Sequence, residues 1–193
     1  MSSLPTAFED VFVHTSTSTK LNAILQEILE AVPDEKVLVF STLHQVLNEL
    51  ANALELCKVP FLFYVSGMPQ HLRNTYVNAF MHKSQFRCLL MSTAIGGSGL
   101  DLHCASRIIL AEPIWQWDLE SQAVKRAWRI GQTRRVLVST YVMRHTYEER
   151  LIERKKARFL DGTDAAEQVQ AMTDDPGMRE FLARPHLVQA PSK

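Results

Sequence analysis

The chain has 193 residues, of which 46% are apolar and 22% charged, and this composition is typical of one globular domain with a tail. No apolar run approaches the roughly 18 residues needed to span a bilayer, and the amino-terminal residues lack the pattern of a signal peptide. The three cysteines are far apart and form no Cys-x-x-Cys pair. The sequence therefore predicts no membrane span, no disulfide and no zinc site.

The net charge of zero hides an uneven distribution of charge. Residues 125–158 contain eleven Lys and Arg against three acids, so the rest of the chain carries a balance of −8. Such a split is typical of a surface that faces a polyanion on an otherwise acidic body. The alternative is that the basic residues at 154–158 simply mark the end of a helix.

Strand-like and helix-like patterns alternate along the chain. Apolar stripes at helical spacing predict helices at 21–29, 43–54, 72–80, 118–130 and 146–158. Short β-branched or aromatic runs predict strands at 36–41, 61–65, 87–92, 107–111 and 136–142. This alternation indicates an α/β fold with a doubly wound, mainly parallel sheet and helices on both faces. Ligands of such folds bind at the carboxyl ends of the strands.

Three segments are expected from these patterns. They are an amino-terminal extension (1–15), one α/β lobe (16–158) and an acidic carboxyl-terminal tail (159–193).

A glycine-rich loop follows the third predicted strand. It contains Gly96, Gly97 and Gly99 within four positions, and such a loop lets backbone N–H groups approach phosphate closely. The hydroxyls of Ser92 and Thr93 add donors, and Asp101 offers an acceptor for a ribose hydroxyl. The loop matches neither the dinucleotide fingerprint nor the P-loop pattern, and a structural turn is the competing interpretation.

The segment 122–132 reads Gln-Ala-Val-Lys-Arg-Ala-Trp-Arg-Ile-Gly-Gln. Arg126 and Arg129 are three apart, so on a helix they would project from one face, with Gln122 one turn earlier. Two guanidinium groups side by side can clamp the charge that develops on a phosphoryl group during its transfer. The alternative is a solvated basic helix end.

The order of these motifs resembles one known family. Ser-Thr-x-x-Gly-Gly-x-Gly-Leu-Asp-Leu is followed by a strand, by Glu-Pro-x-Trp and then by Gln-Ala-x-x-Arg-Ala-x-Arg-Ile-Gly-Gln. The set is similar to the second RecA-like lobe of Swi/Snf-type DNA translocases, the chromatin-remodelling and repair ATPases of helicase superfamily two. The resemblance runs from about Lys36 to Arg158 and implies a RecA-like lobe.

The resemblance also implies roles for particular residues. Arg126 and Arg129 match the arginine fingers that reach the γ-phosphate of ATP. Gln122, Gly99 and Asp101 match positions that contact the nucleotide. The positions that match DNA contacts are Ser41, Thr42, Ser92, Thr93, Gly96, Gly97 and Trp115.

Some residues depart from the family pattern. Trp128 replaces the usual His between the two arginines, and Asp101 stands where Asn is commoner. Ser66 replaces a usual Gly, and Gln116-Trp117 replaces Asn-Pro. The arginine pair itself is retained.

The resemblance implies ATP and Mg²⁺ as cofactors, held mainly by a first RecA-like lobe. No Gly-x-x-x-x-Gly-Lys-Ser/Thr stands in this sequence, so these 193 residues alone are expected neither to hold ATP tightly nor to hydrolyse it. The implied partners are duplex DNA, contacted without sequence preference, the first lobe of the same protein, and nucleosomes. The implied compartment is the nucleus.

Two other functional classes compete with this one. The lobe can be a non-catalytic scaffold that docks DNA or a protein partner, and Trp128 and Asp101 are the residues that favour this alternative. A superfamily-two RNA helicase lobe is disfavoured, because those enzymes carry His/Gln-Arg-x-Gly-Arg-x-Gly-Arg at the position of the arginine pair.

Overall fold

The computed structural model describes residues 18–93 and 100–160. The strands of these ranges are β1 (Val37–Ser41), β2 (Phe61–Tyr64), β3 (Cys88–Ser92), β4 (Arg107–Leu110) and β5 (Leu137–Thr140). The helices are α1 (Thr19–Ala31), α2 (His44–Leu56), α3 (Gln70–His82), α4 (Trp117–Ala127) and α5 (Tyr147–Leu160). Each predicted helix and strand is present, with ends shifted by a few residues.

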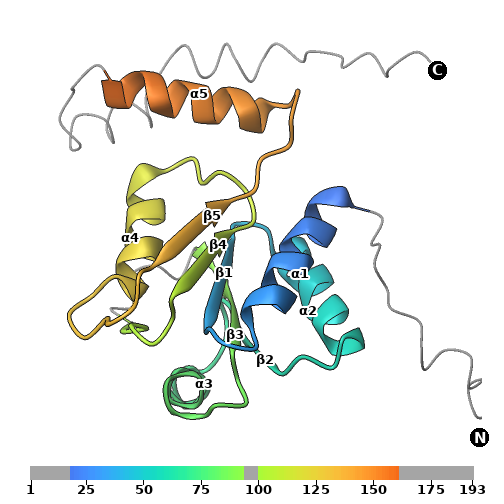
Figure 1. The fold of residues 1–193 in the computed structure, drawn as a ribbon, viewed down its shortest axis with the longest axis vertical. Coiled ribbons are helices and arrows are strands. Elements are labelled where there is room, and N and C mark those ends of the chain that lie inside the picture. Colours follow the sequence, from blue (N-terminus) through green and yellow to red (C-terminus); the bar gives the residue numbers. More distant parts are fainter. Residues whose placement is uncertain (1–17, 94–99, 161–193) are drawn as a thin grey trace, which may run out of the picture.

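The strands form one sheet in the order β2-β3-β1-β4-β5, and every neighbouring pair is parallel (Figure 1). β1 and β3 are buried along their whole length, as expected for strands covered on both faces. The α/β fold with a doubly wound parallel sheet is confirmed. Because all the strands are parallel, the loops after β1, β3 and β4 meet at one edge of the sheet.

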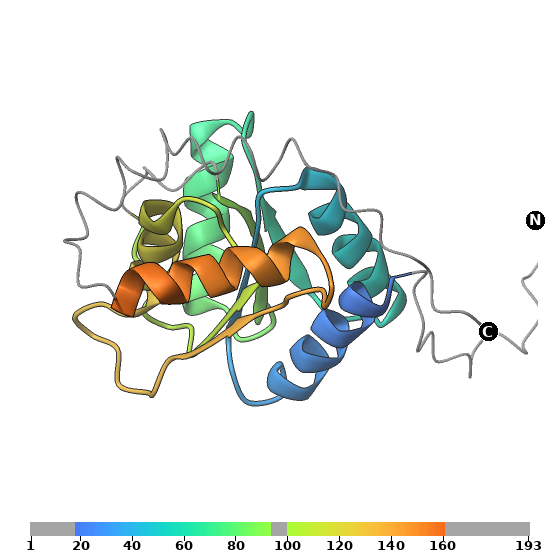
Figure 2. The ribbon, with the colours of Figure 1, turned by 90° about the horizontal axis from the view of Figure 1, so that it is seen from above.

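Helices cover both faces of the sheet (Figure 2). Successive residues of a strand point to opposite faces, so each strand contributes to two clusters. Leu38 packs in a cluster with Phe80 of α3 and Ala123 of α4. Val39 packs in the other cluster with Leu47 of α2, beside residues of α1. The lobe therefore has three layers, with α1 and α2 on one side and α3 and α4 on the other.

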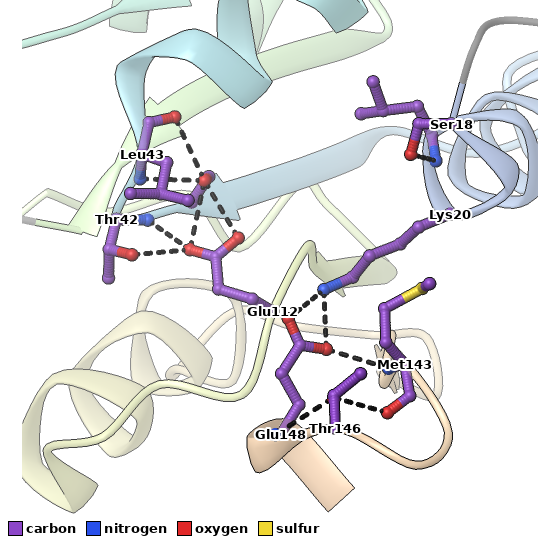
Figure 3. Close-up of polar contacts among 10 residues, drawn as sticks. Ser18, Lys20, Thr42, Leu43, Glu112, Met143, Thr146 and Glu148 are labelled. Atoms are coloured by element: carbon purple, nitrogen blue, oxygen red, sulfur yellow. Dashed lines mark hydrogen bonds and ion pairs between the residues drawn. The ribbon is translucent and has the colours of Figure 1, made fainter. Parts of the chain in front are cut away.

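α5 crosses above the carboxyl ends of the strands (Figure 1). The hydroxyl of Thr146 accepts a hydrogen bond from the backbone of Glu148 at 3.2 Å, which caps the start of the helix. The Glu148 carboxylate is buried and accepts from Lys20 of α1 at 2.7 Å and from the backbone of Met143 at 2.8 Å (Figure 3). Further along, Lys155 pairs with Glu120 of α4. α5 is thus tied to helices on both sides of the sheet.

The end of α4 differs from the prediction. The sequence pattern predicts a helix to Ile130, but α4 ends at Ala127, and Trp128 leaves the helical region with φ −85° and ψ 80°. The carbonyl oxygens at this end are satisfied from outside the helix, because Leu102 N–H donates to the Arg126 carbonyl at 3.0 Å. The side chain of Gln132 donates to the carbonyls of Ala105 at 2.7 Å and Ala127 at 3.4 Å. Tertiary contacts therefore end the helix one turn early.

Candidate functional site at the carboxyl edge of the sheet

A buried carboxylate joins the ends of β1 and β4. Glu112 follows β4 and is 7% exposed, and both of its carboxylate oxygens accept from the Ser41 hydroxyl at 3.0 Å. It also accepts from the backbone N–H and, at 2.8 Å, from the hydroxyl of Thr42 (Figure 3). The Ser41 hydroxyl additionally accepts from the backbone N–H of Leu43 at 3.0 Å. The loop after β1 is thereby held in one conformation.

The sequence pattern did not predict this role for Glu112. It placed Ser41 and Thr42 at a DNA contact and treated Glu112 only as part of a motif. The contact of Ser41 with Glu112 requires β1 and β4 to be neighbours in the sheet. They are neighbours, although β1 ends at Ser41 and β4 begins at Arg107. The sequence signal for this contact was a polar residue directly after each of two buried strands, namely Thr42 and Glu112.

Most of the hydroxyls expected to contact DNA lie inside the lobe. Ser41, Ser92 and Thr93 are buried, and the Thr93 hydroxyl donates to the Ser41 carbonyl at 3.5 Å. Thr42 is exposed. The glycines Gly96, Gly97 and Gly99 lie outside the described residues. Of the four hydroxyl residues, Thr42 is the one whose side chain reaches the surface, and the others support the loop edges.

Asp101 lies at the surface beside the end of α4. Its carboxylate accepts from the ring of His103 at 2.9 Å and from the His103 backbone at 3.4 Å. The hydrogen bond from His103 holds the pKa of Asp101 below its usual range, and the nearby charge of Arg129 adds to this. Asp101 and Arg129, which the sequence assigned to one nucleotide site, are therefore neighbours in space.

The two arginines lie at the boundary between α4 and the segment after it. Burial lowers the pKa of the Arg126 guanidinium, and the neighbouring charge of Arg129 lowers it further. Arg126 lines a narrow cavity with Ser92, Thr93 and Leu100, at the carboxyl end of β3. Arg129 lines a wider cavity beside Trp128.

The expectation that both arginines project from one helical face is wrong, since only Arg126 lies on α4. The two charges approach because residues 128–132 fold back onto the segment after β3. Gly131 has φ +104°, and a Cβ there would lie 3.4 Å from the His103 ring. Glycine therefore permits both the backbone turn and the close approach that place Arg129 near Asp101.

The remaining predicted residues are spread along the same edge. Gln122 is exposed on α4, one helical turn before Arg126. Trp115 is half-buried, between the buried Ile114 and the exposed Gln116. Trp128 is 71% exposed, so it packs little against its own lobe.

Among residues 18–93 and 100–160, no group of three or more His, Cys, Asp or Glu is arranged to hold a metal ion. Within the same ranges, no helix is both long and apolar enough to cross a membrane. Cys57, Cys88 and Cys104 are free thiols.

Comparison with known proteins defines the class of this lobe. The helicase conserved C-terminal domain matches residues 19–131. The crystal structure of the C-terminal part of the Fun30 ATPase domain superposes with a TM-score of 0.68 and 29% identity, over 71% of this chain and 45% of that one. The parallel sheet of the described residues is thus that of a RecA-like C-terminal helicase lobe. The chain belongs to the helicase C-terminal domain family, in its Swi/Snf-type branch.

Individual relatives support the assignment of the chain to the Swi/Snf-type branch. DNA repair protein rad8 of Schizosaccharomyces pombe is 33% identical over 172 residues, which cover 85% of this chain and 15% of rad8. ATP-dependent helicase ULS1 of Saccharomyces cerevisiae is 31% identical over 154 residues, or 76% of this chain and 9% of ULS1. Protein CHROMATIN REMODELING 24 of Arabidopsis thaliana is 30% identical over 176 residues, 88% of this chain and 16% of that protein. The chain spans only a small part of the length of these relatives.

Proposed function

We propose that this chain acts as the second lobe of an ATP-dependent translocase on duplex DNA, and that Arg126 and Arg129 are its arginine fingers. The approach of the Arg129 charge to the Arg126 guanidinium, which lines a cavity at the carboxyl end of β3, is the observation that carries the proposal. Two positive charges held together repel each other, and this arrangement becomes favourable when a polyanion such as the γ-phosphate of ATP lies between the lobes. Gln122, Gly99 and Asp101 would line the same nucleotide.

The nucleotide would be held mainly by a partner lobe. ATP and Mg²⁺ need a phosphate loop and a metal-binding acid, which this sequence does not carry. Closure of the two lobes would bring Arg126 and Arg129 to the phosphate, where positive charge stabilises the transition state. The 193-residue chain by itself would then hydrolyse no ATP, and measurable DNA-stimulated turnover by the purified chain would contradict this part of the proposal.

The DNA contact would be made to one phosphate backbone. Thr42 is exposed and follows β1 at the edge where β3 also ends, and its hydroxyl would turn from Glu112 to a phosphate oxygen when DNA binds. The buried residues Ser41, Ser92 and Thr93 would contribute through their backbone or through loop positioning, and Trp115 would lie beside the DNA. Phosphate contacts carry no base information, so binding should be independent of sequence and weakened by salt.

Opening and closing of the two lobes would move the protein along the duplex, including the duplex of nucleosomes. Such work places the protein in the nucleus, in keeping with relatives named for DNA repair and chromatin remodelling.

A chimera tests the finger assignment. Residues 19–160 of this chain would replace the matching lobe of ULS1, and DNA-stimulated ATP hydrolysis by the chimera would be measured. Arg126→Ala and Arg129→Ala should each lower the maximal rate by on the order of 10³-fold, as expected when a transition-state charge clamp is lost. Arg144→Ala, which changes an exposed arginine after β5, is the matched control. An unchanged rate of ATP hydrolysis in either variant would contradict the assignment of that arginine as a finger.

A scaffold lobe is the second candidate, because Trp128 presents an exposed indole between the two arginines. Under this alternative the chimera would bind duplex DNA but hydrolyse no ATP, with or without the arginine substitutions.

A further inference from the structure

We propose that the acidic segment 161–175 of this chain docks in a groove between α4 and β5. The groove encloses about 420 Å³ and is lined on its apolar side by Val124, Val136 and Val138. Trp128, which is 71% exposed, stands at its rim, and Val138 is 44% exposed. Trp128 and Val138 thus offer apolar side chains that another chain segment can cover.

The groove also lies at the edge of the sheet. Within the described ranges β5 pairs with β4 alone, so its outer edge carries backbone groups that a further segment can reach.

The charge around the groove indicates an acidic occupant. Arg129, Arg134 and Arg135 line it, and no Asp or Glu is among its lining residues. Arg134 donates to the neutral Asp34 carbonyl at 3.0 Å and its charge also acts on Glu35, as that of Arg129 acts on Asp101, whereas Arg135 is exposed. A segment that covers Trp128 and the valines would therefore meet three guanidinium groups, and negative charge on that segment would favour docking.

The first part of the tail has the matching chemistry. Residues 161–175 contain five acids and neither Lys nor Arg. Among these acids stand two large apolar residues, Val169 and Met172. The segment thus combines apolar anchors with the charge opposite to that of the groove.

The end of α5 brings this segment to the groove. Lys155 pairs with Glu120 of α4, and Val124, which lines the groove, lies one helical turn after Glu120. The groove therefore begins one turn, about 6 Å, from the α5 contact and continues to Trp128, which follows the last residue of α4. Both views place the last turn of α5 on the α4 side of the sheet (Figures 1 and 2). Nine residues from Leu160 to Val169 span up to about 30 Å, which is enough to reach it.

Docking would cover Arg129 as well as Trp128, since both line the groove. The tail would then compete with any ligand of Arg129 and lower the availability of one arginine finger. This consequence rests on the proposed function, whereas the docking itself does not.

The test measures the exposure of Trp128 in the intact 193-residue chain, without ATP or DNA. The indole N–H signal of Trp128, assigned with Trp128→Phe, would be broadened by a soluble paramagnetic agent. A short connection supplies an effective concentration on the order of millimolar, so a contact with a millimolar Kd is occupied about half of the time. Neutralising three tail acids together (D161N, D164N and E167Q) should raise the broadening of the Trp128 signal about twofold. The reason is that the tail would no longer shield Trp128 for half of the time.

A matched control neutralises three exposed acids on α1 and α2, across the sheet from the groove (E30Q, E49Q and E55Q), and should leave the broadening unchanged. Arg134→Gln with Arg135→Gln should reproduce the effect of the tail substitutions from the groove side. Equal broadening in the native chain and the tail variant would overturn the proposal. A fall in the broadening of the Trp128 signal as the protein concentration rises would also overturn the proposal, since a second copy of the chain would then occupy the groove. Because no nucleotide is present, failure here leaves the finger assignment untouched.

Discussion

The carboxylate of Glu112 holds the hydroxyl of Ser41 at 3.0 Å from each of its oxygens, and so joins the ends of two neighbouring strands. Glu112→Ala would remove the acceptor of the Thr42 hydroxyl and backbone N–H, and would leave the Ser41 hydroxyl with the Leu43 carbonyl at 3.2 Å as its acceptor. The free energy of unfolding should fall by about 3 kcal/mol, because each orphaned buried donor costs roughly 1–3 kcal/mol. Chemical denaturation measures this loss. Glu55→Ala, at an exposed position of α2, should change stability by less than about 0.5 kcal/mol. Equal losses in the two variants would contradict the role of Glu112.

Acid should weaken the lobe through Arg107. This residue donates to Glu35 at 2.8 Å and to Glu27 at 3.1 Å, and its hydrogen bond is the main reason that the pKa of Glu35 lies below its ordinary value of 4.5. Because the folded-state pKa is lowered, the stabilisation is complete above 4.5 and is lost as the pH falls through the lower folded value.

Arg107→Met should therefore lower stability at pH 7 by about 1 kcal/mol and reduce its dependence on pH below 4.5. Urea unfolding at several pH values measures both effects. Arg87→Met is the control, since Arg87 donates to the backbone carbonyls of Pro33 and Ser84. If the stability of Arg107→Met falls with acid as steeply as that of the native chain, a group other than the Arg107–Glu35 pair causes the pH dependence.

Gly131 should be required for the position of Arg129. Gly131→Ala puts a Cβ on a backbone with φ +104°, which costs roughly 1–2 kcal/mol, and brings that atom to 3.4 Å from the His103 ring. Gly67→Ala is the matched control, because Gly67 has φ +85° but open space around it. Both variants should lose similar stability, whereas only Gly131→Ala should shift the NMR signals of His103 and Asp101. Unchanged signals in Gly131→Ala would refute the proposed contact.

The thiol of Cys88 should resist modification in the folded lobe. Burial raises its pKa to about 12, whereas Cys57 is only half-buried. A disulfide reagent at neutral pH should label Cys57 first and Cys88 on the order of 10²-fold more slowly, after local or global opening. Mass spectrometry of the labelled peptides measures the order. Labelling of both thiols at equal rates in the native protein would contradict the buried position of Cys88.

The order of helices and strands was predictable because each depends on a local pattern. The run from Val37 to Phe40 is apolar, and with Ser41 it is buried along its whole length in the structure. In the predicted stripe at 43–54, Leu47, Leu50 and Leu54 are buried, whereas Leu43 is 54% exposed. The family was also evident from motif order alone, since the spacing of the loops and of Arg126 and Arg129 is a property of the chain.

The geometry of the candidate site depended on contacts between distant segments. Helical periodicity extends to Ile130, yet α4 ends at Ala127 because Leu102 and Gln132 take its last carbonyl groups. The pairing of Ser41 with Glu112 needs the strand order of the sheet, which no local pattern contains. By itself, the sequence determined which residues form each element, since periodicity and turn residues act over a few positions. Only the tertiary structure decided which hydroxyls are buried and how Arg129 approaches Arg126, because hydrogen bonds between segments far apart in the chain set both.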